Sequence, residues 1–420
     1  MYDDLEPGLT PEQQAYKEAV HHFAAKVLRP ASAALDRLVD PGAVIEAESA
    51  LWPALHQAWR LGYHRAMLPA ELGGVSAVEQ HILLEEMGWG AADLALGIVL
   101  AGFPAVVVAQ TGNPDLIGEF ARPFAEDTAA RRIGCWAISE PEHGSDAVLL
   151  GTPEFVDPRL SAESIARRDR DCYVLNGAKA AWVSNGSIAT HALMFLSLDP
   201  GRGMAGGGVA IVPLHVRGVS RGKPLDKMGQ RALNQGEIRF EEVRIPERYM
   251  ITDPTLYAFF LDRTLALASV SMAAVFTGAA RAAYEAALAH TKTRVQGGKP
   301  LCEHQLVQKR LFDMFARVEA CRALSRAALV HNHAMVPPPT EHAIAAKTFC
   351  TEAAFEVVSS ALQLFGGGGL EREHPIEKLF RDARASLLEH GSNDVLALVA
   401  ARRLLERRPG SAVRRGAATA

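Results

Sequence analysis

The sequence predicts an α+β protein in which a helical part, a β-rich part and a second helical part follow one another. Three observations support this: helical spacing of large apolar residues at the start, short extended runs separated by turn residues in the middle, and long alanine-rich stretches thereafter. With 420 residues the chain is too long for one hydrophobic core. We expect an N-terminal helical domain (1–130), a central β-barrel-like domain (131–248), a C-terminal four-helix bundle (249–408) and a tail (409–420).

The first part carries helix signals. Thr10 followed by Pro11 predicts a helix start, because threonine can accept a hydrogen bond from the first turn and proline fits the first helical position. Trp52, Leu55 and Trp59 recur at helical spacing, so we expect them to pack inward. No catalytic pattern occurs in this part.

The middle part carries strand signals. Asn176-Gly177 lies between extended runs at 173–175 and 180–183, which predicts a hairpin turn. Further strands are expected over 191–198, 208–214 and 238–245. The glycine-rich residues 201–208 are expected to join two of these strands, since no helix follows them to form a phosphate site.

The last part returns to helix. Residues 265–290 are alanine-rich and apolar on most sides, as in a helix buried within a bundle. A second helix is expected over 343–365, ending at the glycines 366–369. The prolines at 337–339 are expected to separate two helices.

Composition excludes several classes of protein. Apolar residues make up 49% and charged residues 22% of the chain, as in an ordinary globular protein. The net charge of −4 argues against a protein that binds nucleic acid by bulk charge. The longest apolar run, 94–109, is shorter than a bilayer-spanning helix and contains glycines and a proline, so it predicts a core helix and no membrane span.

Two further features concern the cell compartment and the chain ends. The five cysteines lack metal-ligand spacing, and the acidic residues 1–4 do not resemble a signal peptide, so we expect a reducing cytoplasm and no metal site. The basic C-terminal stretch is interpreted as a helix end and tail rather than a nucleic-acid contact. It consists of Arg402, Arg403, Arg407, Arg408, Arg414 and Arg415.

Several motifs occur in a fixed order from about residue 10 to 408. They are SEPEHGSD at 139–146, NGAK at 176–179 with WVSN at 182–185, KMG at 227–229, FEEVRIP at 240–246, Arg294 with GKPL at 298–301 and Gln305, QLFGG at 363–367, and RDA at 381–383. Their order and spacing resemble the acyl-CoA dehydrogenase family. Glu142 and His143 depart from the small residues usual there. The resemblance implies an FAD-dependent oxidoreductase of acyl thioesters.

A flavin ring needs hydrogen-bond partners at its edge and flat packing on one face. Backbone groups from Ala137 to Ser139 and the Ser139 hydroxyl are expected at the edge, with Trp182 near the ring and Ser184 bonded to it. Arg294 and Ser145 are expected to serve the pyrophosphate, and Gly366 and Gly367 to allow close backbone approach. The resemblance adds Gln305, Gln363 and Ser392 to the expected FAD-binding residues.

In the family, the arginine and the glycine turn reach the FAD of a neighbouring subunit. The resemblance therefore implies a homo-oligomer, a tetramer arranged as a dimer of dimers. An electron-transfer partner or an acyl carrier protein is a further expected partner, whereas nucleic acid and membrane are not expected.

The residue at the base position departs from the family. Family members carry RDAxxxxIYEGT, whose glutamate removes the α proton of the thioester. Counting from Arg381 places Glu389 on the tyrosine and His390 on the glutamate. Some relatives carry the glutamate on an earlier helix, but that position falls at about Ala268.

Three interpretations of the base position stay open. His390 precedes a helix start at Ser392, whose dipole should favour the neutral, base-competent imidazole, whereas Glu389 acts in the opposite direction. Glu389 is an alternative base, and neither residue acting is the third possibility. The favoured function is α-proton removal and β-hydride transfer to flavin; the alternatives are a flavin monooxygenase of the same fold and a flavin-binding partner subunit without a base.

Overall fold

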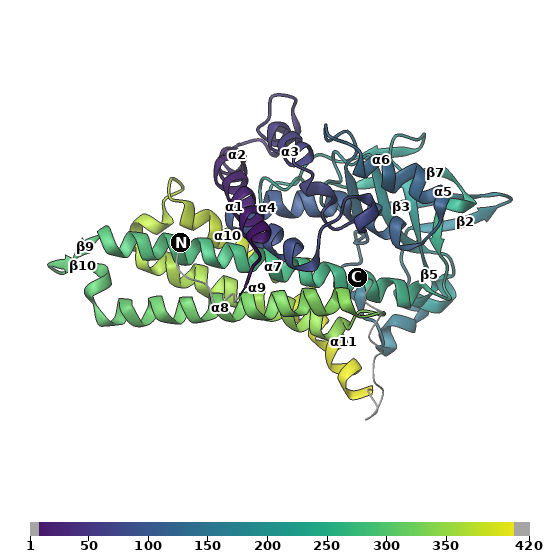
Figure 1. The fold of residues 1–420 in the computed structure, drawn as a ribbon. Helices are drawn as coiled ribbons and strands as arrows, with labels where there is room; N and C mark the ends of the chain where they lie inside the picture. The colour runs from purple at the N-terminus through teal and green to yellow at the C-terminus, as the bar shows by residue number, and fades with distance from the viewer. Residues whose placement is uncertain (1–7, 407–420) are drawn as a thin grey trace.

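Two long apolar helices, α4 (Ala77–Gln110) and α7 (Tyr257–Thr293), run side by side through the centre of the molecule (Figure 1). The structure is a computed structural model that describes residues 8–406. Both helices are long and apolar enough to cross a bilayer, but their most apolar windows are 100% and 78% buried inside the protein. Glycine permits their close approach: a Cβ added to Gly278 would lie 2.0 Å from the carbonyl oxygen of Glu85.

The N-terminal part is helical, as predicted. With α4 it comprises α1 (Pro11–Phe23), α2 (Arg29–Asp36), α3 (Leu51–Arg60), α5 (Pro114–Leu116) and α6 (Arg122–Ala125). The predicted start at Thr10 is confirmed, because its hydroxyl accepts the Gln13 N–H at 3.3 Å and the Gln13 side chain accepts the Thr10 N–H at 3.1 Å. Leu55 and Trp59 are buried as predicted, whereas Trp52 is only half-buried.

The central part is a mixed sheet of eight strands. They are β1 (Gly134–Ala137), β2 (Ile165–Asp169), β3 (Cys172–Lys179), β4 (His191–Ser197), β5 (Gly207–Pro213), β6 (Val219–Arg221), β7 (Ile238–Pro246) and β8 (Met250–Thr252). Their order is β6-β7-β3-β2-β4-β5-β8, with β1 paired to β4. Within the described residues β6 and β8 do not pair, so the sheet is open and the expected barrel-like closure does not occur.

The hairpin predicted at Asn176-Gly177 was wrong. β3 runs straight through both residues and pairs with β7, with a bulge between Leu175 and Gly177. The turn lies instead between β2 and β3, where Arg170 adopts a φ of 58°. A local turn preference is overridden because the β7 ladder supplies partners on both sides of the bulge.

The C-terminal part is a helical bundle built on α7. Its other helices are α8 (Gln305–Ala334), α9 (Thr340–Phe365), α10 (Pro375–Ser386) and α11 (Asn393–Glu406), and a small hairpin of β9 (Val295–Gln296) and β10 (Lys299–Pro300) caps one end. The prolines do separate α8 from α9, and α9 ends at Gly366 with a φ of 60°, as predicted. Some predicted features lie outside the described residues: the acidic start at residues 1–4, the expected tail (409–420), and Arg407, Arg408, Arg414 and Arg415 of the basic stretch.

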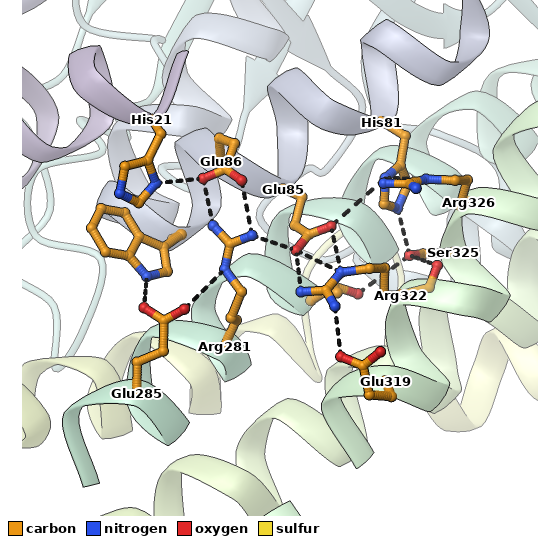
Figure 2. Close-up of polar contacts among 12 residues, drawn as sticks. His21, His81, Glu85, Glu86, Arg281, Glu285, Glu319, Arg322, Ser325 and Arg326 are labelled. Carbon is orange, nitrogen blue, oxygen red and sulfur yellow. Dashed lines mark hydrogen bonds and ion pairs between the residues drawn. The ribbon is translucent and has the colours of Figure 1, made fainter. Parts of the chain in front are cut away.

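A buried ion-pair network joins the N-terminal helices to the bundle (Figure 2). Arg281 on α7 bonds Glu85 and Glu86 on α4, each at 2.8 Å, and Arg322 on α8 bonds Glu85 at 3.0 Å. His21 on α1 approaches Glu86 at 2.8 Å. Burial alone would raise the pKa of Glu85, but Arg322 and Arg281 outweigh it and hold that pKa well below its usual range.

Breaking this network should destabilise the protein strongly. Arg281→Met leaves two buried carboxylates with fewer cations, so the free energy of unfolding should fall by about 3–5 kcal/mol in urea denaturation. Arg317→Met removes an exposed pair with Glu356 on the same bundle and should cost less than about 1 kcal/mol. If both variants lost the same small amount of unfolding free energy, the buried network would not stabilise the protein as proposed.

Candidate active site

A cavity of about 540 Å³ opens between the sheet, α4 and the segment that joins α10 to α11. Leu96 and Leu100 of α4 and Trp136 of β1 give it apolar walls. Polar groups come from three loops: residues 139–145 after β1, residues 182–184 after β3 and residues 226–230 before β7. The last helical turn of α10 and the residues after it close the remaining side. A volume of this size with a few convergent polar groups is typical of a ligand site.

Four of the residues predicted to hold the flavin meet in this cavity. Ser139, Ser145, Trp182 and Ser184 all line it. Trp182 is 62% exposed, so one face of a large aromatic ring is free to pack against a ligand. The Ser184 hydroxyl accepts a hydrogen bond from Gln235 at 3.1 Å, which fixes its place.

Two further predicted residues lie beside the cavity. Ala137 is fully buried in β1, next to the lining residue Ile138, and leaves only its backbone as a possible contact. Ser392 lies directly before α11, and its N–H donates to the Ser145 hydroxyl at 2.9 Å. This bond ties the loop after β1 to the segment that carries His390.

The other predicted cofactor residues lie elsewhere. Arg294 follows α7 beside the β9–β10 hairpin, at the opposite end of the bundle from the sheet (Figure 1). The ring of Phe365 stacks on His290 with centroids 4.1 Å apart, which brings the end of α9 to the same place. Exposed residues therefore gather there, outside the lining of the cavity: Arg294, Gln305, Gln363, Gly366 and Gly367.

His390 lies in the wall of the cavity, in an unusual backbone conformation. Its φ is 57°, a left-handed value that costs energy in a residue other than glycine. The ring packs 5.4 Å from that of Trp136, and Nδ1 is enclosed without a hydrogen-bond partner among the described residues. Burial, and then the ammonium of Lys347, lower the pKa of His390 to about 3. The imidazole is therefore neutral at physiological pH.

Lys347 of α9 supports the turn at His390, and sequence reasoning did not find it. Its side chain is completely buried, and Nζ donates to the Gly391 carbonyl at 3.0 Å and to Asn393 Oδ1 at 2.6 Å. Burial lowers the pKa of Lys347 to about 8. The available signal was a lysine on the apolar face of the helix predicted over 343–365.

Glu389 faces the same cavity with a different partner. Its carboxylate accepts a hydrogen bond from Gln230 Nε2 at 2.9 Å, and burial raises the pKa of Glu389. Gln230 is held in turn by Asp382, which accepts its backbone N–H. Gln230 was the second residue missed from the sequence, because its role depends on a contact with a segment about 150 positions away.

The residues present fit FAD in two separate groups. The cavity offers an exposed indole, three serines and enclosed space, which suits a flavin ring. The far end of the bundle offers Arg294 and an open glycine turn, where a Cβ added to Gly366 or Gly367 would meet nothing within 4 Å. One chain does not bring these groups together.

Three family models match most of the chain. The chain matches the acyl-CoA dehydrogenase N-terminal domain over residues 10–128, the middle domain over 135–243 and the C-terminal domain over 260–405. The chain belongs to the acyl-CoA dehydrogenase family. It is thus an FAD-dependent oxidoreductase of acyl-CoA-type substrates, as its motifs implied.

Individual relatives cover almost the whole chain. The mitochondrial short-chain specific acyl-CoA dehydrogenase of Rattus norvegicus is 30% identical over 413 residues, which is 96% of this chain and 92% of that protein. The butyryl-CoA dehydrogenase structure from Megasphaera elsdenii is 28% identical, with a TM-score of 0.84 over 96% of this chain and all of that one. A nitroalkane oxidase structure, 24% identical over 96% of this chain and 97% of that one, has a TM-score of 0.84 and shows the shared fold alone.

The support given by Lys347 can be tested directly. Lys347→Met removes the side-chain donor of the Gly391 carbonyl and the shorter of the two hydrogen bonds to Asn393 Oδ1, so we expect a loss of about 2–4 kcal/mol in urea unfolding. Amide exchange at residues 390–392 should quicken as the turn loosens. Lys309→Met, which removes an exposed pair with Asp313, is the matched control. Indistinguishable stability of the two variants would show that Lys347 does not hold the turn.

Proposed function

We propose that the protein dehydrogenates an acyl thioester between the α and β carbons, with His390 as the proton acceptor. The observation that carries this is a neutral imidazole in the cavity wall, with an unpartnered ring nitrogen and a strained backbone. Strained residues with perturbed pKa values concentrate at reactive sites. Ala268, the other position considered for a base, is buried in α7 and has no ionisable group.

The chain's residues would divide the work as follows. His390 takes the α proton, and the electron pair left behind forms the α,β double bond. Bound FAD supplies the acceptor for the hydride that leaves the β carbon. Leu96, Leu100 and Trp136 keep water from the reacting carbons, and Lys347 holds the base in position through Gly391.

Glu389 is less suited to be the base. Its carboxylate already accepts a hydrogen bond from Gln230, which holds it in one orientation. The His390 imidazole has no hydrogen bond to break among the described residues before proton transfer. We therefore assign Glu389 to the lining of the acyl pocket.

We further infer that the protein works as a homotetramer in the cytoplasm. The separation of Arg294 and the glycine turn from the cavity supports a site that two subunits complete. An electron-transfer protein would reoxidise the flavin, and the acyl carrier would be coenzyme A or an acyl carrier protein.

Arg294→Ala should weaken FAD binding without disturbing the cavity. Loss of a pyrophosphate partner should cost about 2–4 kcal/mol of binding free energy, measured by flavin retention on gel filtration and by apoprotein titration. Added FAD should raise the melting temperature and the apparent mass of dilute wild-type protein, and do so less for the variant. Unchanged affinity in Arg294→Ala, or tight binding by a monomer, would contradict the shared site.

The test of His390 is the rate of flavin reduction by an acyl thioester without oxygen. His390→Ala and His390→Gln should each lose about 2–4 orders of magnitude, since neither accepts a proton. Because a pKa of about 3 keeps the wild-type imidazole neutral, its rate should stay flat from pH 8 to about pH 5. The burial that lowers the pKa of histidine raises that of a carboxyl group, so the rate of His390→Glu should fall at a higher pH.

Two outcomes would reject this role. If His390→Gln matches the wild type in rate and pH profile, His390 is not the base. If no thioester reduces the wild-type flavin while His390→Glu is reduced, the histidine marks a different chemistry. Oxygen uptake by the reduced protein would then distinguish a monooxygenase from an inactive partner subunit.

A further inference from the structure

The wall of the cavity beside His390 carries hydrogen-bonding capacity that the protein itself does not use. Gln230 is 1% exposed and lines the cavity. Its Nε2 donates to the Asp382 carbonyl at 3.2 Å and to Glu389 at 2.9 Å, which fixes the direction of the amide. Its Oε1 is left without a partner in the described chain. A buried amide oxygen in this state costs free energy unless a ligand or water donates to it.

The Glu389 carboxylate also has unused hydrogen-bond acceptor sites. A carboxylate offers about four acceptor sites, and the Glu389 side chain receives one hydrogen bond, from Gln230, within residues 8–406. The charges of Lys227 and Lys347 lower the pKa of Glu389, but neither lysine forms an ion pair with it within the described residues. Lys227 instead donates to the Leu233 carbonyl and to Gln235. Lys347 donates to the Gly391 carbonyl and to Asn393. Next to each other on this wall, Gln230 Oε1 and the Glu389 carboxylate are therefore acceptors with unused capacity, whereas the unpartnered donors of the described lining, Trp136 Nε1 and Arg384 Nη1, belong to other residues of the cavity.

A plain alkyl chain would leave these acceptors without hydrogen-bond donors. It would displace water from Glu389 and return no hydrogen bond, which costs about 1–3 kcal/mol for each polar group left unpaired. An acyl group with a hydroxyl or amino hydrogen would instead donate to the free acceptors. A site built to bond such a group rejects the analogue that lacks it.

We propose, on the basis of the function proposed above, that Glu389 and Gln230 select an acyl group that carries a hydrogen-bond donor. The substrate class is then a hydroxyacyl or aminoacyl thioester rather than a saturated hydrocarbon chain. Leu96, Leu100 and Trp136 pack against the carbon atoms, and the Glu389–Gln230 pair receives the donor.

A carboxylated acyl group is the rival substrate. Arg384 also lines the cavity, and its Nη1 has no partner in the described part of the chain, so it offers a cation. A substrate carboxylate near Glu389 would be repelled by the like charge. The donor therefore fits the pair better, and the carboxylate becomes an outcome of the test.

The experiment measures binding, by anaerobic calorimetry of the FAD-loaded protein, for coenzyme A thioesters of matched shape. The hydroxyl-bearing 4-hydroxybutyryl and 3-hydroxybutyryl groups are compared with pentanoyl and 3-methylbutyryl groups, and glutaryl is included. At least one hydroxyl-bearing ligand should bind about 10- to 100-fold more tightly than its hydrocarbon partner. Glu389→Tyr, which places the family's residue there, should bring that ratio close to one, and an unchanged melting temperature of the FAD-loaded variant shows that it is folded.

Gln230→Met removes the free amide oxygen but keeps the backbone N–H that Asp382 accepts, so it should reduce the ratio in part. Equal binding of each matched pair by the wild type would overturn the proposal. So would a hydroxyl preference that survives Glu389→Tyr, or a preference for glutaryl that Arg384→Met abolishes. Flavin reduction is followed separately: a donor preference without reduction would reject the proposed dehydrogenation and leave the specificity assignment standing.

Discussion

One buried carboxylate, that of Asp382, holds the three parts of the molecule around the cavity. It accepts a hydrogen bond from the backbone N–H of Gln230, in the loop before β7, and another from the ammonium of Lys378, which also bonds Asp93 on α4 at 2.8 Å. Sheet, first helical part and bundle therefore meet at a single point. Burial raises the pKa of Asp382 to about 6 despite the ammonium of Lys378. A carboxylate kept in such a place is typically fully hydrogen-bonded, because an unpaired buried charge is costly.

The same reasoning distinguishes the scaffold from the site. In the network of Glu85, Glu86, Arg281 and Arg322, each of the two glutamates has at least two partners within the protein, and no ligand is needed to supply them (Figure 2). Several polar side chains around the cavity have fewer hydrogen-bond partners within the described part of the protein than they can accept. Gln230 Oε1 and His390 Nδ1 have none in the described chain, and the Glu389 side chain has one. Polar groups left incomplete beside a cavity are those that a ligand can complete, and their positions constrain what the ligand must offer.

The sequence could predict whatever depends on nearby residues. Helices α7 and α9 and strands β4, β5 and β7 follow from composition and spacing, and the cap at Thr10 follows from that residue and Pro11. The hairpin at Asn176-Gly177 failed because pairing with β7, a distant segment, outweighed a local preference. Lys347 and Gln230 went unnoticed for the same reason: each matters through a bond to a residue more than 40 positions away, Gly391 for the lysine and Glu389 for the glutamine. The flavin-binding residues at two distant places stay a prediction from motif order, because local spacing does not link them.

A histidine at the base position changes what the cavity must do. Burial makes a carboxylate a stronger base, because its negative charge is costly to enclose. Burial has the opposite effect on an imidazole: it favours the neutral form and makes the group a weak base, with a pKa of about 3 for His390. Such a group takes a proton only when negative charge develops near it. The α carbon and the thioester carbonyl of the substrate supply that charge during proton removal. Lys347 opposes the imidazolium, so it favours return of the proton once the product has formed. The exchange of glutamate for histidine is therefore chemically workable where the substrate itself supplies that charge, because the charged side chain that acts on the pKa of His390 is the cation Lys347.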